Sequence, residues 1–430
     1  MNRIILIGNG FDLTHGLKTS YKHFIDNFWQ KKIEFIRENK SFNDPDNDVE
    51  FNSRISNPSI PFHRLSECFD YKSLESFCLK HQTKISPINK FLYLLSKNCS
   101  LRNWVDIEKE YYSKLIEFIY PTHETTNHSI YSYKYEDIDD LNNEFEKIKN
   151  LFYEYLNKYI IIETIKPNVN ILNRIVENYH YKDFTQSYKK TMLQDKLKYI
   201  KQIMNKEQAN CENNENSIRS FFKYNDPSKP KEILKILDAQ DSYCFFPDLF
   251  PNNFLLLNFN YTNTTSLYKK GIQKYKIDID GSENIQLEEI HIHGELNNQR
   301  NVPIFGFGDE IDEDYSKIEN LDDNKYLENI KSTRYHETDN YKKLLEYIDS
   351  DYFQIFIFGH SCGLSDRTLL STLFNHQNCV SIKPFYHKKE DGTDNYSDIV
   401  RNISRHFKNK ASLRDKVVNK TYCEPLTGTK

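Results

Sequence analysis

The sequence has no C-x-x-C pair, although it contains eight cysteines. Cysteines scattered in this way argue against a zinc ribbon, and we expect no metal ion. The sequence also lacks an apolar run as long as a transmembrane helix, and Gly8 interrupts its first apolar run, so neither a membrane span nor a signal peptide is expected. These absences predict a cytoplasmic protein with reduced thiols and no membrane partner.

The sequence also lacks a large excess of charge of one sign, because its 58 Lys and Arg residues nearly balance its 62 Asp and Glu residues. The net charge of −4 provides no basic field, so we expect no clear nucleic-acid partner. We interpret the frequent Tyr and Phe residues as mainly structural. A chain of 430 residues can bury a large core, which predicts one core with a substantial insertion, or two domains.

The opening 21 residues combine a strand signal with glycines. Residues 4–7 form a short apolar run typical of a buried strand. Gly8 and Gly10 then allow a sharp turn and the close approach of a ligand such as a phosphate group. The dinucleotide fingerprint requires a third glycine where Leu13 stands, which disfavours hydride transfer. Asp12 suits a helix cap at least as well as a ligand contact, since a carboxylate beside a pyrophosphate costs free energy.

Hydrophobic periodicity changes along the chain. Residues 21–39 and most of residues 63–237 show helical spacing, whereas residues 43–61 are rich in Asn, Asp, Ser and Pro and predict a loop. Short apolar runs that predict strands lie at residues 254–259, 290–292, 302–307, 353–358 and 380–386. Helices are expected near residues 341–348, from residue 367 and at residues 396–407.

This order of elements predicts an α/β protein. We expect a Rossmann-like parallel sheet built from residues 1–40 and 250–430, with residues 41–249 as a large helical insertion. Polar or glycine-rich clusters follow four of the expected strands, at residues 260–265, 293–296, 306–310 and 359–366. Since ligands bind at the carboxyl ends of strands in open α/β sheets, these clusters favour one pocket.

Three side chains in these clusters are candidates for chemistry. His293 titrates near physiological pH and precedes a glycine, so it could act as a general base, whereas His291 is interpreted as structural. The amide of Asn260 can orient a ribose hydroxyl or a water molecule. Ser361 suits a helix cap first and a phosphate contact second.

Ser361 also fits a rival function. Residues 359–363 match G-x-S-x-G, the nucleophile elbow of serine hydrolases. Several later aspartates and histidines could complete a triad, so this alternative stays open.

One segment before the second half is unusual, namely residues 103–111, which include Trp104, Asp106 and Glu108. Asp106 and Glu110 share a helical face and could serve acid/base chemistry or cap a pocket. Acidic residues in a first helical turn more often stabilise the helix, and we favour that interpretation.

These blocks resemble the AbiH family of bacteriophage abortive-infection proteins over nearly the whole chain. The matching blocks are residues 8–12, 16–21, 104–108, 258–262, 291–294, 305–309 and 359–361. The AbiH family in turn resembles sirtuins and sirtuin-like bacterial defence NADases, which carry a Gly-x-Gly loop, a Thr-x-Asn-x-Asp block, a His-Gly block and a Gly-x-Ser block in this order.

The resemblance implies roles for particular residues. It assigns Asn260 and His293 to catalysis. It implies nucleotide binding by the loops that contain Gly8, Asn9, Gly10, Phe11, Asp12, Tyr261, Thr262, Gly294, Gly359, His360, Ser361 and Asp366. Two residues depart from the sirtuin pattern, because Thr262 replaces an aspartate and Asp12 replaces a serine. The zinc ribbon of the deacylases is absent as well, which argues against deacylation.

The resulting hypothesis is antiphage defence by hydrolysis of NAD or a related nucleotide at its N-glycosidic bond, with NAD as substrate. A nucleotide-sensing module without turnover and a serine hydrolase that uses Ser361 are the alternatives. A phage-derived trigger and association with a second copy of the chain are left open as partners.

Overall fold

The computed structural model of this chain describes residues 1–40, 49–53, 61–102, 105–120, 135–207, 212–227, 229–239, 242–280 and 285–428. Contacts divide the chain into two compact units. Unit 1 comprises Met1–His15, Ile162–Pro303 and Glu337–Lys430, and unit 2 comprises Gly16–Ile161 and Ile304–His336. The predicted boundaries at residues 40/41 and 249/250 stay a prediction, because compactness alone does not show which parts fold independently.

Unit 1 contains a five-stranded sheet in which every strand runs parallel to its neighbours. Its strands are β1 (Asn2–Ile7), β4 (Asn253–Asn258), β5 (Gln286–His291), β6 (Phe353–Phe358) and β7 (Cys379–Phe385). The spatial order is β5-β4-β1-β6-β7, so the first strand is central and the order reverses beside it. In such sheets the carboxyl ends around the reversal are where ligands bind. The mixed α/β class and the parallel sheet are therefore confirmed.

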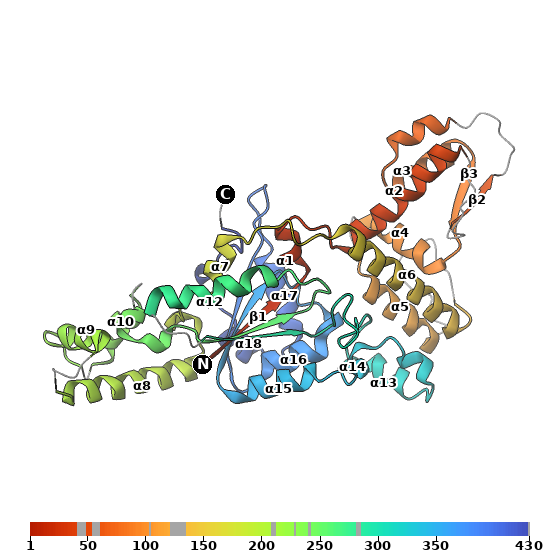
Figure 1. Ribbon diagram of the computed structural model, residues 1–430. Helices are drawn as coiled ribbons and strands as arrows, with labels where there is room; N and C mark the ends of the chain where they lie inside the picture. Colours follow the sequence, from red (N-terminus) through yellow and green to blue (C-terminus); the bar gives the residue numbers. More distant parts are fainter. Residues whose placement is uncertain are drawn as a thin grey trace. The chain divides into compact units, whose positions relative to one another are not determined.

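Helices cover both faces of this sheet. Figure 1 shows α12 (Ser266–Asp280) on one face and α15 (Asn340–Ser350) with α16 (Arg367–Asn375) on the other. Every residue of β1, β6 and β7 is buried, as expected for parallel strands that are covered twice. Ile5 and Ile7 of β1 pack with Tyr268 of α12 in one apolar cluster.

The remaining helices extend each unit. Unit 1 also contains α1 (Asn9–Thr14), α7 (Val169–Ile175), α8 (Gln186–Asn205), α9 (Asn213–Phe222), α10 (Pro230–Leu237), α11 (Ser242–Phe245), α17 (Tyr396–Arg405) and α18 (Lys410–Lys416). Its short 3₁₀ helices are η2 (Tyr181–Asp183), η4 (Pro247–Leu249), η6 (Leu364–Asp366) and η7 (Lys420–Tyr422).

Unit 2 is mainly helical. It contains α2 (Tyr21–Asn39), α3 (Tyr71–Lys80), α4 (Lys90–Arg102), α5 (Ile107–Ile119), α6 (Ile138–Tyr159), α13 (Glu313–Glu319), α14 (Lys331–Arg334), η1 (Phe62–Glu67) and η5 (Asn324–Leu327). The predicted helix at residues 21–39 is confirmed. Ser20 caps it by accepting a hydrogen bond from the His23 amide at 3.2 Å, and the Phe24 ring lies 5.4 Å from the Phe152 ring of α6.

Two sequence-based predictions of local structure are wrong. Residues 302–307 form no strand, because only Phe307 makes an isolated bridge, with Ile330, and Pro303 lacks an amide hydrogen for a ladder. Part of the loop predicted at residues 43–61 is a strand, β2 (Val49–Ser53), which pairs antiparallel with β3 (Thr83–Pro87). In both cases the presence or absence of a distant partner strand decides the outcome.

Each helix in the described part of the chain is either too short or too polar to cross a bilayer.

Candidate functional site

Two glycine-containing loops pack directly on each other at the carboxyl edge of the sheet. The Gly10 amide donates to the Gly359 carbonyl at 2.9 Å, and the Gly8 amide donates to the Phe358 carbonyl at 3.1 Å. A Cβ on Gly8 would lie 2.4 Å from the His360 Cα, and one on Gly359 would lie 2.1 Å from the Phe11 nitrogen. Gly359 also has a φ of +68°, which favours glycine. Loop packing therefore requires these glycines whether or not a ligand is bound.

Asp12 is not a helix cap, so that interpretation is wrong. Helix α1 begins three residues earlier, at Asn9, and its N-cap position is Gly8. The Asp12 side chain is only 1% exposed, and Thr262 Oγ1 donates to its Oδ2 at 2.6 Å. Burial raises the pKa of the Asp12 carboxyl to about 6, although the Thr262 hydrogen bond acts in the opposite direction. The side chains of Thr264 and Asn260 also lie near this carboxyl, but Asp12 Oδ1 has no described partner at hydrogen-bond distance and angle.

Asn260 joins the loop after β4 to the loop after β1. Its side-chain amide donates to the Gly8 carbonyl at 3.1 Å, and its backbone amide donates to Asn258 Oδ1 at 2.9 Å. Asn258, the last residue of β4, also donates to the Thr262 carbonyl at 3.2 Å. The structure therefore places Asn260 beside the glycine turn, where the sequence predicted it. The supporting role of Asn258 was missed.

His293 shares a carboxylate with His360. His293 Nε2 lies 3.1 Å from Asp366 Oδ1, and His360 Nε2 lies 3.6 Å from Asp366 Oδ2. The Phe259 ring packs against both imidazoles, with ring centroids 5.2 Å and 4.2 Å apart. Because Phe259 precedes Asn260, these contacts bring the loops after β4, β5 and β6 together. Asp366 was predicted to bind the nucleotide, and in the structure its carboxylate lies beside two histidines.

The other predicted binding residues differ in exposure. Asn9 and Ser361 are exposed, whereas Phe11 and Tyr261 are buried. The Phe11 ring lies 5.6 Å from the Tyr268 ring, and the Tyr261 carbonyl accepts from the Leu296 amide at 3.1 Å. Packing therefore accounts for Phe11 and Tyr261.

Gly294 forms the turn after β5. It has a φ of +78°, and a Cβ there would lie 2.3 Å from the Val302 carbonyl oxygen. The turn requires glycine for both reasons.

The surroundings of Ser361 do not favour a serine hydrolase. Its carbonyl accepts from Asn402 Nδ2 at 2.7 Å, and the nearby His406 contacts the Cys362 carbonyl through Nε2 at 2.9 Å. No histidine in the described part of the chain contacts the Ser361 hydroxyl. A nucleophilic serine needs such a base within hydrogen-bond reach.

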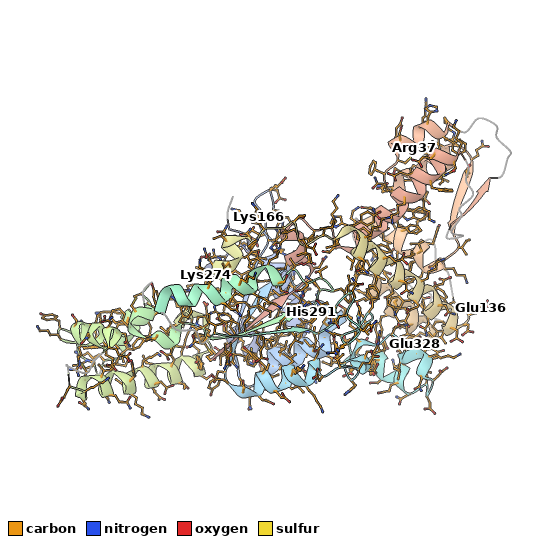
Figure 2. All side chains as sticks on the ribbon, viewed as in Figure 1. Arg37, Glu136, Lys166, Lys274, His291 and Glu328 are labelled. Atoms are coloured by element: carbon orange, nitrogen blue, oxygen red, sulfur yellow. The ribbon has the colours of Figure 1, made fainter. Side chains whose placement is uncertain are left out.

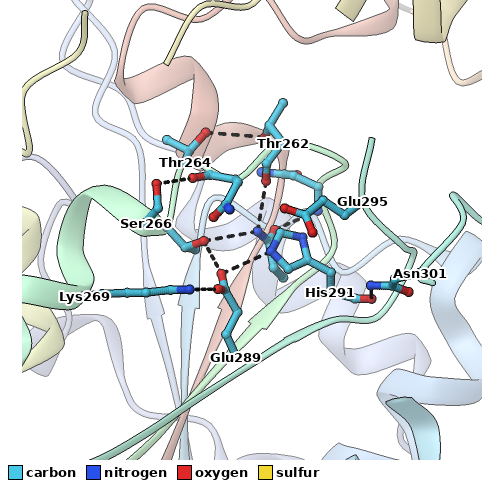
Figure 3. A network of polar contacts seen from close by, with 12 residues as sticks. Thr262, Thr264, Ser266, Lys269, Glu289, His291, Glu295 and Asn301 are labelled. Carbon is cyan, nitrogen blue, oxygen red and sulfur yellow. Dashed lines mark hydrogen bonds and ion pairs between the residues drawn. The ribbon is translucent and has the colours of Figure 1, made fainter. Parts of the chain in front are cut away.

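His291, interpreted as structural from the sequence, belongs to a second network (Figure 3). His291 Nε2 lies 3.3 Å from Glu289 Oε1, and Glu289 also pairs with Lys269 of α12 and accepts from the Thr265 hydroxyl. Burial alone would raise the pKa of the Glu289 carboxyl, but contacts with His291 and Lys269 outweigh it and lower the pKa to about 2. One sequence signal was available, since Glu289 and His291 alternate along β5 and so share a face.

Figure 2 labels His291 within the side chains that surround the sheet of unit 1. Its ring is 7% exposed, and its Nδ1 has no hydrogen-bond partner among the described residues.

A cavity of about 560 Å³ lies at the opposite, amino edge of the sheet. Its lining includes Tyr352 before β6, Cys379 at the start of β7, Thr185 before α8 and Ser412 of α18. The strands therefore separate this cavity from the predicted site residues at their carboxyl ends.

The Asp106 segment belongs to unit 2. Asp106 caps α5 by accepting from the Lys109 amide at 3.1 Å, so the helix-stabilising interpretation is confirmed. Glu108 is buried and pairs with Lys331 at 2.9 Å, while its other oxygen accepts from the Gly306 amide at 3.3 Å. The glycine block at residues 305–309 therefore packs within unit 2. Trp104 lies outside the described residues.

The model of the family described as "Bacteriophage abortive infection AbiH" matches residues 4–387. No curated protein and no solved structure matches the chain.

Proposed function

Because the chain belongs to the AbiH family of bacteriophage abortive-infection proteins, whose role is in phage defence, we propose that it defends the cell by hydrolysing NAD or a related nucleotide at the N-glycosidic bond. The site is the carboxyl edge of the sheet in unit 1. One observation supports this proposal most strongly, namely that Asn260 and His293 lie on neighbouring loops around Phe259, next to the glycine turn.

The fold part of the proposal is a Rossmann-like, sirtuin-like arrangement. Counted in chain order, the five strands lie in the order 3-2-1-4-5, which is the order of dinucleotide-binding sheets. The nucleotide would cross the carboxyl end of β1, where the order reverses. The loops after β1 and β6 meet at this point through Gly10 and Gly359.

Cleavage of the glycosidic bond develops oxocarbenium character on the ribose. The site must therefore hold the ribose, exclude bulk water and direct one water molecule at the anomeric carbon. Asn260 would orient that water or a ribose hydroxyl, because its amide is fixed by the Gly8 carbonyl. His293 would assist proton movement, with its ring oriented by Asp366. The phosphates would lie along the glycine loops beside the exposed Asn9 and Ser361.

The two departures from the sirtuin pattern support the same proposal. Asp12 stands where a serine is expected and Thr262 where an aspartate is expected, and the two side chains are hydrogen-bonded at 2.6 Å. A carboxyl and a hydroxyl are thus both present, with their positions exchanged. A carboxyl and a hydroxyl therefore remain near Asn260, the asparagine that would contact the ribose.

Nicotinamide release from NAD by the purified protein tests the proposal. The variants Asn260→Ala and His293→Ala are expected to lose release while still unfolding cooperatively above the assay temperature, with a lowered melting temperature because each loses a buried contact. His376→Ala is the matched control, because His376 Nε2 also contacts an aspartate, Asp349, at 3.1 Å, but next to β7 at the amino edge. Equal release by all four proteins would rule out this site.

A nucleotide-sensing module without turnover is the second candidate. Asn260 and His293 are only 9% and 4% exposed, and both are held by protein groups, which favours a site that is closed at rest. A phage-derived trigger or a second copy of the chain would open it. Saturable NAD binding with no nicotinamide release, even for protein isolated from phage-infected cells, would favour this function over hydrolysis.

A further inference from the structure

Two buried polar atoms at the carboxyl edge of the sheet lack hydrogen-bond partners among the described residues. They are Asp12 Oδ1 and His291 Nδ1. The two residues are 1% and 7% exposed, so bulk water does not compensate either atom. Buried polar atoms in native proteins are nearly always paired, and an unpaired one costs free energy. Two such atoms on one edge of the sheet are therefore available to a bound water or ligand.

The contacts of His291 define what its Nδ1 can do. Glu289 is held as a carboxylate by Lys269 and the Thr265 hydroxyl, and it faces His291 Nε2 at 3.3 Å. A carboxylate can only accept, so Nε2 carries a proton toward Glu289, and in the neutral ring Nδ1 then presents a lone pair. In this tautomer Nδ1 of His291 is an acceptor.

Asp12 is an acceptor as well. Its Oδ2 accepts from the Thr262 hydroxyl, and Oδ1 retains its lone pairs. No Lys or Arg in the described part of the chain forms an ion pair with Asp12.

The two acceptors belong to one structure. Asn258 Nδ2 donates to the carbonyl of Thr262, which binds Asp12, and lies 3.5 Å from the hydroxyl of Thr265, which binds Glu289. We name Asp12, Thr262, Glu289 and His291 the acceptor corner. Hydrogen-bond acceptors beside the carboxylates of Asp12 and Glu289 attract hydrogen-bond donors and repel a phosphate group.

We propose that the acceptor corner binds the hydroxyl groups of a ribose, with Asp12 Oδ1 and His291 Nδ1 each accepting a hydrogen bond from the sugar. This inference rests on the proposed function, since it says which part of the nucleotide, the ribose, the acceptor corner binds. The inference also changes the role of Asp12. The family resemblance placed Asp12 in the phosphate loop, whereas here its carboxyl contacts the sugar.

Calorimetric binding of ADP-ribose and of pyrophosphate to the full chain tests the inference. Asp12→Asn replaces the acceptor Oδ1 by an amide donor, because Thr262 keeps the amide oxygen on its own side. His291→Gln keeps a donor toward Glu289 and removes Nδ1. Each variant is expected to weaken ADP-ribose binding by about tenfold or more, the order expected when a buried polar contact is lost. Pyrophosphate binding should change less than about twofold in either variant.

His376→Gln is the matched control, since it makes the same substitution in another histidine–carboxylate pair of unit 1, here with Asp349. It should leave both affinities unchanged. If the corner variants fold, as judged by their melting temperatures, and bind ADP-ribose as tightly as the control, the inference is wrong. It is also wrong if the intact protein binds no ADP-ribose at millimolar concentration.

A second measurement needs no variant to fold. In protein labelled with ¹⁵N-histidine, the His291 ring signal should move on addition of ADP-ribose and stay in place with pyrophosphate, while the His376 signal stays in place with both. A stationary His291 signal in saturating ADP-ribose would overturn the inference. ADP-ribose binding through His291 without any nicotinamide release would leave the inference standing and remove only the proposed hydrolysis.

Discussion

The two edges of the parallel sheet in unit 1 differ in what they offer a ligand. The carboxyl edge brings together loops after β1, β4, β5 and β6, and its polar side chains are buried in fixed contacts. The amino edge has a cavity of about 560 Å³ lined mostly by hydroxyl and amide groups. This cavity and the buried polar side chains with fixed contacts therefore lie at opposite ends of the same strands. The comparison teaches that a cavity alone does not locate the chemistry, because this cavity lies away from the oriented groups.

The largest expected effect concerns activity at the carboxyl edge. His293→Ala should lower nicotinamide release by about 10²–10⁴-fold, the usual contribution of a general acid or base. The reason is that Asp366 orients His293 beside Asn260. Steady-state kinetics on NAD check this result. A loss below threefold would contradict the role given to this edge.

The next effect is on stability. Gly359→Ala should lower the free energy of unfolding by about 3 kcal/mol or more, because backbone strain at positive φ adds to a collision with Phe11. Gly392→Ala is the control, since Gly392 has a φ of +81° but no atom within 4 Å of an added Cβ. Its cost should be about 1 kcal/mol, from strain alone. Equal urea midpoints for the two variants would show that the two glycine loops do not pack as described.

A smaller effect depends on pH. The pKa of Asp12 is about 6 in the folded protein and lies near its ordinary value of 3.8 in the unfolded chain, so ionisation of this carboxyl destabilises the fold as pH rises between these values. Asp12→Asn removes this dependence and should be more stable than the intact protein above pH 6, by up to about 3 kcal/mol relative to their difference at pH 4. Urea unfolding at pH 4 to 8 measures the difference. A difference that stays constant with pH would show that Asp12 is not buried as described.

The smallest effect is expected at the amino edge. Ser412→Trp places a large ring against the cavity lining and should change both nicotinamide release and ADP-ribose affinity less than about twofold, since no residue assigned to the site lies there. A strong loss of either quantity would remove the distinction between the two edges.

The strands of the sheet were largely predictable from the sequence. β1 and β6 each end in a run of four apolar residues, 4–7 and 355–358, and both strands were located to within a few residues. Residues 302–307 have the same local character and still form no strand, because a strand also needs a partner with which to pair. Local composition cannot provide that information.

The site was predictable only in part. Asn260 and His293 were found because each follows a strand, and their neighbouring positions follow from the pairing of β4 with β5. The bond between Asp12 and Thr262 joins residues 250 positions apart, and no local pattern indicates it. The Lys269–Glu289–His291 contacts likewise depend on how α12 packs on the sheet. The sequence separated His293 from His291 by a neighbouring glycine, whereas the contacts give each histidine a carboxylate partner.

The central claim is that segments from β1, β4, β5 and β6 form one nucleotide site, and a structure with ADP-ribose bound tests it most directly. We predict density for the diphosphate along the loops of Gly10 and Gly359, with a ribose between Asn260 and the acceptor corner. Density in the cavity at the amino edge, with the carboxyl edge empty, would contradict the claim.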